Sequence, residues 1–230
     1  MQLKKTATTT SLALALALTA TLGLGACGSS DSSSTAAGSS SSALETTAAT
    51  AVATVPAVPG GTTAVALDAD FVAALGTLGL TPGVIGGATL ADGTVTFPVT
   101  GGTVTLYDRE SGYRPWVQGV LFHEGSGLSL TAGTTTVELT DFTIDPGKPA
   151  RLFGNVSVNG RPAAASAPLF NLDGSTLEPP TMTSDGSAVL AGTGVKLAPE
   201  AAALLNQTFS TDALAGGLLV GISTITVATK

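Results

Sequence analysis

Residues 135–158 read TTVELTDFTIDPGKPARLFGNVSV, and their pattern is the strongest indication of a β fold in the chain. In its last third, Leu152 and Val156 occupy alternate positions among polar residues, which is the two-residue period of a strand with one buried face. The pair Pro146-Gly147 precedes this run, and such a pair is typical of a tight turn. We therefore predict two antiparallel strands joined by a short turn.

In the first strand of this pair, the apolar residues switch from odd-numbered to even-numbered positions halfway along. Val137 and Leu139 share one face, whereas Phe142 and Ile144 fall on the opposite one. Because side chains alternate strictly along a strand, a one-residue bulge near Thr140-Asp141 would restore a common buried face. The pattern predicts such a bulge.

The same kind of run recurs on both sides of this stretch. Gly-containing turn pairs such as Asp92-Gly93 and Asn159-Gly160 separate many of the runs, and Pro98 favours an edge or first position for the run that contains it. The pattern indicates a mainly β fold, an antiparallel β-sandwich or barrel with two short helices. The predicted strands are residues 95–99, 103–107, 117–123, 128–131, 135–144, 151–158, 188–190 and 222–227.

Two segments favour helix. Asp68 or Asp70 is positioned to cap a helix that begins near Phe71. A second helix is predicted at residues 199–207, where Pro199 suits the first turn and the following glutamate favours the positive helix start.

The first 27 residues are typical of an export signal. Lys4 and Lys5 precede an apolar run at residues 12–24, whose 13 residues fall short of the roughly 20 needed to span a bilayer. The tetrad Leu24-Gly25-Ala26-Cys27 then resembles the lipobox of bacterial lipoproteins. This resemblance implies a signal peptide at residues 1–26 and lipidation of Cys27. We therefore expect a lipid anchor in the cell membrane, at its extracytoplasmic face; the alternative is an ordinary secretory signal with a chance cysteine.

The rest of the chain divides into two parts. Residues 27–61 carry the expected lipid and continue as a tether rich in Ser, Thr, Ala and Pro, with too little bulky apolar surface to fold, so we expect it to be disordered. Residues 62–230 are long enough for a single β-rich domain with its own core. Since Cys27 is the only cysteine, this domain forms no internal disulfide.

Composition argues against several functions. After loss of Lys4 and Lys5, 7 basic residues face 16 acidic ones, so nucleic acid is not an expected partner. One histidine and one lipidated cysteine do not make a zinc site, and no nucleophile-elbow or phosphate-loop motif occurs. We expect no catalytic residues, no metal site and no enzyme activity.

One segment stands out by its composition. Residues 107–130 hold both tyrosines, the only tryptophan and the only histidine. Tyr and Trp are enriched at binding sites, so Tyr107, Tyr113, Trp116 and His123 are the candidate ligand-binding residues. The alternative is that the aromatic rings pack at the end of the sandwich.

This segment and its continuation resemble the HtaA-type haem-acquisition domain of bacterial surface proteins. The resemblance lies in residues 119–130 (GVLFHEGSGLSL), 139–144 (LTDFTI) and 150–156 (ARLFGNV), about 40 of the 230 residues. It implies a β-rich domain that holds haem through a tyrosine with a nearby histidine. His123 matches the motif histidine, but the Trp- and Tyr-containing opening of that family is absent near Phe71, so no tyrosine is carried over.

Three functions follow as hypotheses. The first is a surface-exposed lipoprotein whose non-enzymatic β-domain binds a protein or small molecule, or has a structural role, with no cofactor. The second is an HtaA-like lipoprotein that binds and transfers haem through His123 with Tyr107 or Tyr113. The third is a cell-envelope hydrolase with His123 as its base.

Overall fold

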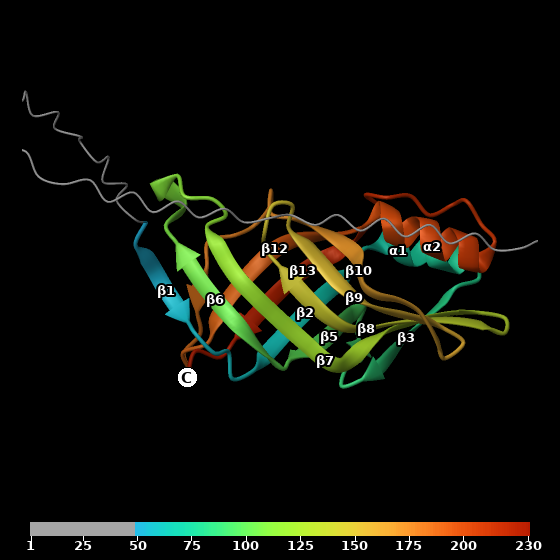
Figure 1. Ribbon diagram of the computed structural model, residues 1–230, viewed down its shortest axis with the longest axis horizontal. Coiled ribbons are helices and arrows are strands. Elements are labelled where there is room, and N and C mark those ends of the chain that lie inside the picture. Colours follow the sequence, from blue (N-terminus) through green and yellow to red (C-terminus); the bar gives the residue numbers. More distant parts are fainter. Residues whose placement is uncertain (1–48) are drawn as a thin grey trace, which may run out of the picture. The chain divides into compact units, whose positions relative to one another are not determined.

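The computed structural model describes residues 49–230, which form a mainly β unit with two helices (Figure 1). The predicted signal peptide, Cys27 and most of the predicted tether lie outside these residues. The strands are β1 (Ala51–Val55), β2 (Gly61–Leu67), β3 (Thr81–Gly86), β4 (Thr89–Ala91), β5 (Thr94–Val99), β6 (Gly101–Tyr107), β7 (Val117–Ala132), β8 (Thr135–Asp145), β9 (Arg151–Val158), β10 (Arg161–Asp173), β11 (Thr181–Met182), β12 (Ala188–Leu197) and β13 (Leu219–Val227). The helices are α1 (Ala69–Thr77) and α2 (Pro199–Phe209), and one 3-10 turn, η1, spans Arg109–Ser111.

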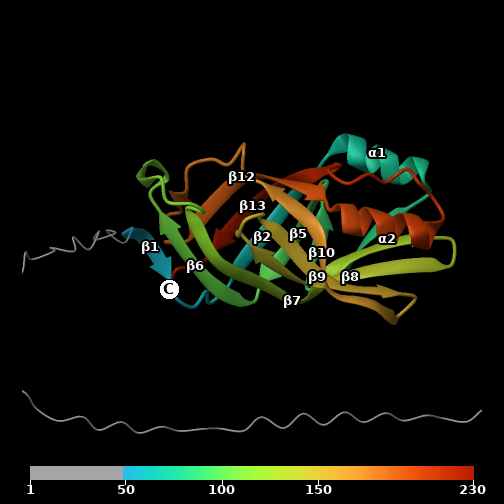
Figure 2. The ribbon, with the colours of Figure 1, turned by 45° about the horizontal axis from the view of Figure 1, so that its top comes forward.

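All strand pairs are antiparallel and belong to one sheet, which confirms the predicted fold class. The order of strands is β1-β6-β7-β8-β9-β10-β12-β13-β2-β5-β4, with β11 beside β12 and β3 beside β7. The sheet curls around its core as a half-barrel (Figures 1 and 2). Inside the curl, Phe97 of β5 lies edge-on to Phe142 of β8, with 5.2 Å between ring centroids. Strands far apart in the sheet order therefore meet inside the curl.

The half-barrel has two different ends. Because β6 to β10 follow one another as antiparallel neighbours, the connections β6–β7, β8–β9 and β10–β12 lie at one end, which we call the loop end. Both helices lie at the other, the helix end, as Figure 1 shows. β1 enters at the loop end, because Ala51 pairs with Tyr107 at the end of β6. β13 finishes there too, with Val227 opposite Gly61 of β2.

Both helix predictions are confirmed. The Asp68 carboxylate caps α1 by accepting hydrogen bonds from the N–H groups of Asp70 and Phe71, at 3.0 and 3.1 Å. Pro199 occupies the first turn of α2, where its missing N–H costs no hydrogen bond. Neither helix in the described part of the chain is long and apolar enough to cross a membrane.

The predicted bulge in β8 is confirmed as well. The register between β8 and β9 shifts between Thr140 and Thr143, and Asp141 adopts a left-handed conformation with φ of 55°. Its carboxylate accepts hydrogen bonds from the Gly125 N–H at 3.0 Å and from the Asn155 side chain at 3.2 Å. Asp141 therefore ties the bulge to both neighbouring strands.

The predicted end of the tether is wrong, because ordered structure begins well before residue 61. β1 pairs with β6, and Val55 and Val58 are buried, at 8% and 5% exposure. A strand of alternating small and apolar residues needs a partner to fold, and β6 supplies it. The folded unit therefore includes residues 51–61.

Other strand predictions need correction. The runs at residues 117–123 and 128–131 belong to one strand, β7, whose register with β8 shifts between His123 and Gly127. β5 is not an edge strand, since β2 and β4 flank it. β4 pairs only with Thr94–Thr96, however, so Pro98 lies where one side of β5 has no partner among the described residues.

Candidate binding cavity

The curled sheet encloses a cavity of about 770 Å³. Its walls are apolar side chains from strands on every side, including Val65, Phe97, Phe142, Leu172 and Ile225. Sites for small molecules in proteins usually measure about 300–1,000 Å³ and are lined in this way. The cavity therefore has the size and lining of a small-molecule site.

His123 lies at the inner part of this cavity and is 1% exposed. Its Nδ1 is 3.3 Å from the Phe142 carbonyl oxygen, and its Nε2 is 2.8 Å from the Thr63 hydroxyl oxygen. A carbonyl only accepts, so we assign the proton to Nδ1, and the Thr63 hydroxyl then donates to Nε2. Both ring nitrogens have a partner within the protein.

Burial keeps this imidazole neutral. Removal from water disfavours the charged form and lowers the pKa of His123 from 6.5 to about 4, while the hydrogen bond to Phe142 acts in the opposite direction. The Phe97 ring stands edge-on to the imidazole, with 6.4 Å between ring centroids. The inner part of the cavity is thus polar in places but uncharged at neutral pH.

The mouth of the cavity is at the loop end. Lining residues come from all three connections there, among them Trp116, Lys148 and Leu177. Two further lining residues, Val52 of β1 and Met182 of β11, are 66% and 62% exposed. Apolar side chains therefore continue from the interior to the solvent at this end.

The four predicted binding residues fall into two groups. Trp116 and His123 line the cavity, whereas Tyr107 and Tyr113 do not. The two tyrosine rings instead lie against each other, with centroids 4.5 Å apart, and Tyr113 is 41% exposed. The structure brings only half of the predicted set to one site.

Trp116 is held at the mouth by a neighbouring cation. The Arg109 guanidinium lies over the indole ring, 4.9 Å from its centroid. The same guanidinium donates to the Leu177 carbonyl at 3.3 Å, so Arg109 links the β6–β7 and β10–β12 connections. This contact joins two loops across the loop end.

The surroundings of His123 bear on the two chemical hypotheses. A serine hydrolase needs a carboxylate to orient its histidine, but Nδ1 of the only histidine faces a backbone carbonyl. Haem held by a tyrosine and a histidine would need both in the cavity, and neither tyrosine lines it. The arrangement does not present the ligand pair that the HtaA resemblance implies. Residues 49–230 also contain no cluster of three His, Cys, Asp or Glu side chains that could hold a metal ion.

Fold and cavity together define an antiparallel half-barrel with an apolar cavity of about 770 Å³. The fold is similar to the crystal structure of the C-terminal domain of HtaA from Corynebacterium glutamicum, with a TM-score of 0.51 and 14% identity over 74% of this chain and 97% of that one. A domain-swapped dimer of a variant of the same domain aligns with a TM-score of 0.43 and 15% identity, over 70% of this chain and 92% of that one. No protein-family model and no curated protein sequence matches the chain. The likeness is one of fold, and at that level it agrees with the resemblance seen in the sequence.

Sequence reasoning missed several residues of the cavity. Thr63, Arg114 and Lys148 line it, and none of them was predicted. Arg114 and Lys148 could have been found from the sequence, since both are basic residues in connections between predicted strands, where binding residues are common. Thr63 carried none, because only the curl of the sheet brings it to His123.

Proposed function

We propose that this chain is a non-enzymatic carrier or receptor, anchored to a membrane through Cys27, that binds a small apolar molecule inside its half-barrel. The observation that carries the proposal is the cavity of about 770 Å³ with its apolar walls. Burial of apolar surface contributes roughly 25 cal/mol per Å², so such a cavity favours an apolar ligand over a polar one. The described chain also begins beside the mouth, since β1 lines the cavity there.

Binding of a neutral fluorescent probe tests the cavity directly. N-phenyl-1-naphthylamine brightens when it leaves water, so the full chain with Cys27→Ser, which carries no acyl groups of its own, should enhance its emission in a saturable way. Absence of saturable enhancement would overturn the proposal.

Two isoleucines on β13 provide a matched pair of variants. Ile225 lines the cavity, whereas Ile222 is on the opposite face of the strand and is 40% exposed. Ile225→Trp should fill part of the cavity and weaken probe binding about tenfold or more, whereas Ile222→Trp should leave it unchanged. Equal effects of both substitutions would place the probe elsewhere.

Haem is a second candidate, favoured by the HtaA-like fold and by His123 in the cavity wall. Since no tyrosine lines the cavity, coordination there would rest on His123, which would have to exchange its hydrogen bond with Thr63 for the iron. Haemin added to the full chain should then give a shifted Soret band that His123→Ala alters. If there is no shift, or if His123→Ala leaves the shift unchanged, haem is excluded as a ligand of this site.

A further inference from the structure

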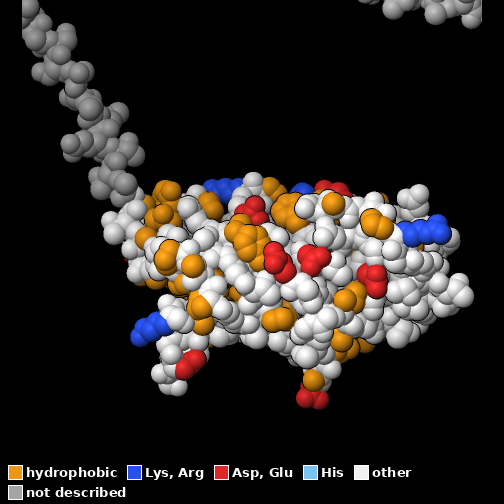
Figure 3. Space-filling model, turned by 60° about the horizontal axis from the view of Figure 1, so that its bottom comes forward, with side chains coloured by type: hydrophobic (Ala, Val, Ile, Leu, Met, Phe, Trp, Pro, Cys, Tyr) orange, Lys and Arg blue, Asp and Glu red, His pale blue; other side chains and the backbone are white. Residues whose placement is uncertain are grey.

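The charges that line the cavity are all of one sign. Only Arg114 and Lys148 bring an ionic side chain to its wall, and no Asp or Glu of residues 49–230 lines it. This is the opposite of the whole chain, in which 16 acidic residues outnumber 9 basic ones. Figure 3 shows acidic side chains spread over one outer face of the domain. The cavity therefore differs in charge from the surface around it.

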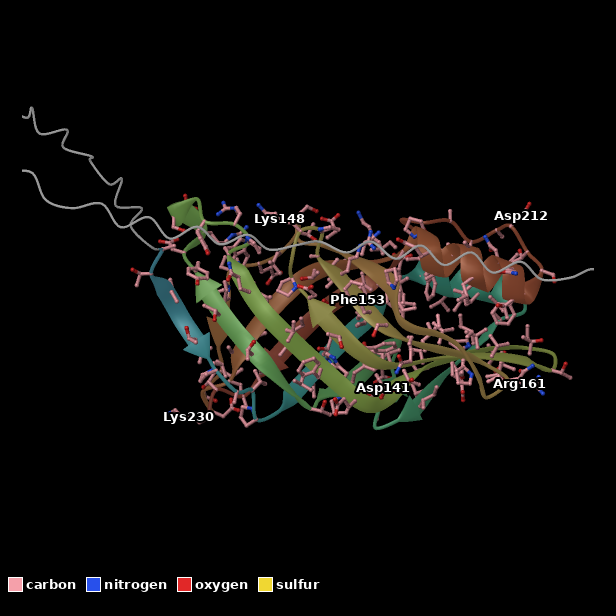
Figure 4. All side chains as sticks on the ribbon, in the orientation of Figure 1. Asp141, Lys148, Phe153, Arg161, Asp212 and Lys230 are labelled. Atoms are coloured by element: carbon pink, nitrogen blue, oxygen red, sulfur yellow. The ribbon has the colours of Figure 1, made fainter. Side chains whose placement is uncertain are left out.

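Both cations are at the mouth. Arg114 is in the β6–β7 connection and Lys148 in the β8–β9 connection, which lie at the loop end, and both side chains are exposed. Figure 4 shows Arg161, by contrast, at the helix end. A ligand that fills the cavity from the loop end would pass these two cations and not Arg161.

Within residues 49–230, neither cation forms an ion pair with a carboxylate. The Arg114 guanidinium donates to the backbone carbonyls of Tyr113 at 2.8 Å and Arg109 at 3.0 Å, which hold it in place without cancelling its charge. The Asp145 carboxylate, in the same turn as Lys148, accepts from the Gly147 N–H at 2.9 Å. The ion pairs of the described chain are Arg151 with Glu200 and Lys196 with Asp173, and neither involves the mouth.

The interior offers no such charge. Thr63, Thr193, Ser223 and the neutral imidazole of His123 are its buried polar groups, and an ionic group placed among them would lose its hydration without gaining a counter-charge. An arginine at the mouth, by contrast, presents paired N–H donors that match a carboxylate or a phosphate. A ligand with one ionic group would therefore keep that group at the mouth.

We propose that the cavity binds an anionic amphiphile, whose acyl chain lies along the interior and whose carboxylate or phosphate group lies beside Arg114 and Lys148. This rests on the proposed function, because it names the class of ligand that the same cavity takes. The proposal concerns binding alone and includes no covalent step.

Competition against N-phenyl-1-naphthylamine tests the class of ligand. Dodecanoate, dodecyl phosphate, dodecanol and dodecyltrimethylammonium share one chain and differ in their heads, and each is added below the concentration at which it forms micelles. The full chain with Cys27→Ser should bind dodecanoate or dodecyl phosphate about tenfold more tightly than dodecanol. Dodecyltrimethylammonium should bind most weakly. Comparison of the two anions distinguishes a fatty acid from a phosphate-headed lipid. The preference should shrink as salt is raised, because exposed charges are screened.

Variants at the mouth separate the role of charge from that of the cavity. Arg114→Gln with Lys148→Gln should reduce the preference for the anions to within about twofold and leave the affinity for dodecanol unchanged. Arg161→Gln is the control, since it removes a cation at the far end and should change nothing.

The outcomes also distinguish this inference from the proposed function. If the probe binds but dodecanol competes as well as the anions, or if the double variant keeps the preference, the anionic class is wrong and the apolar cavity stands. If the probe binds and no dodecyl compound displaces it, the amphiphile is wrong. If nothing binds, both proposals fall.

Discussion

The Nε2 atom of His123 lies 2.8 Å from the Thr63 hydroxyl oxygen, although β7 and β2 are not neighbours in the sheet. Strands β8, β9, β10, β12 and β13 separate them along the strand order. The curl of the sheet therefore brings these two strands together, and Phe97, which pairs with Thr63, also lies against the His123 ring. The hydrogen bond is a buried polar link between strands that do not pair with each other.

Stability should depend on pH through His123. Its folded pKa of about 4 lies below the ordinary value of 6.5, so the unfolded chain takes up a proton between these values and the folded protein does not. Well above pH 6.5 the His123 imidazole is neutral in both the folded and the unfolded state, so it makes no pH-dependent contribution to the free energy of unfolding there. The free energy of unfolding should fall by about 3 kcal/mol as pH drops from 6.5 to 4, measured by urea unfolding at a series of pH values.

The variant His123→Asn is the control for this pH dependence. This variant should be less stable at neutral pH, because it disturbs the buried hydrogen bonds of His123. It should also lose the decline between pH 6.5 and 4, because His123 is the only histidine. Two aspartates respond at lower pH. The hydrogen bond from the Gly125 N–H is the main cause that lowers the pKa of Asp141, and the hydrogen bond from Lys196 is the main cause that lowers the pKa of Asp173. Their contributions are lost as pH falls below about 4. A decline that survives in His123→Asn would contradict the assignment.

Thr63→Val should destabilise the domain because it leaves a buried acceptor without a donor. Valine has nearly the shape of threonine but no hydroxyl, so Nε2 of His123 loses its hydrogen bond at a site that is 1% exposed. An unsatisfied buried group costs about 1–3 kcal/mol. Thr63→Ser keeps the hydroxyl and should cost less. Equal loss in both variants, measured by chemical denaturation, would show that the methyl group matters and the hydrogen bond does not.

Gly154→Ala should disturb the wall of the cavity. A Cβ atom there would lie 2.7 Å from Leu169 Cδ1 and 2.8 Å from Phe142 Cδ1, both in the packed core. Overpacking of this kind costs about 1–3 kcal/mol and should weaken probe binding, because Phe142 lines the cavity. Gly76→Ala in α1 is the matched control, since its Cβ would meet nothing within 4 Å. It should leave binding unchanged and raise the melting temperature, as helix interiors prefer alanine.

Asp141→Ala should loosen the bulge in β8. The carboxylate accepts from two strands, and alanine accepts from neither while also straining the left-handed backbone at φ of 55°. We expect a loss of about 2 kcal/mol. Asp141→Asn keeps an acceptor and tolerates that backbone, so it should retain most of the stability. A smaller loss for alanine than for asparagine in thermal unfolding would contradict this role.

Cys27→Ser tests the anchor that the lipobox resemblance implies. Wild-type chain from bacterial cells should partition with membranes and carry acyl mass on Cys27 at a new N-terminus. The serine variant should appear in soluble fractions, because two or more acyl chains are needed for stable attachment. Mass spectrometry that finds a free thiol at Cys27 in the wild type would end the proposal of an anchored protein.

The sequence predicts those parts of the fold in which the local pattern is strong. β9, the Asp68 cap of α1, Pro199 in the first turn of α2 and the bulge at Asp141 each follow from a few adjacent residues. β10 was missed because Pro162, Pro168 and a run of alanines carry little preference for a strand, and pairing with β9 overrides this only through several register shifts. Its strand structure depends on tertiary context.

The site was harder to predict than the fold for a similar reason. His123 and Trp116 stood out because their residue types are rare in this chain, and both line the cavity. The same argument selected Tyr107 and Tyr113, which contact each other outside it. Composition identifies scarce residues but not the direction in which their side chains point. The cavity itself arises from the curl of the whole sheet, so no local stretch encodes it.

The pairing of β2 with β13 has a consequence for how the domain forms. Gly61 pairs with Val227, so one wall of the half-barrel is missing until Leu219–Val227 is available. Contacts between such distant residues are slow to form because a long loop must close first. The proposed ligand could therefore be held only after β13 has paired with β2 and closed this wall.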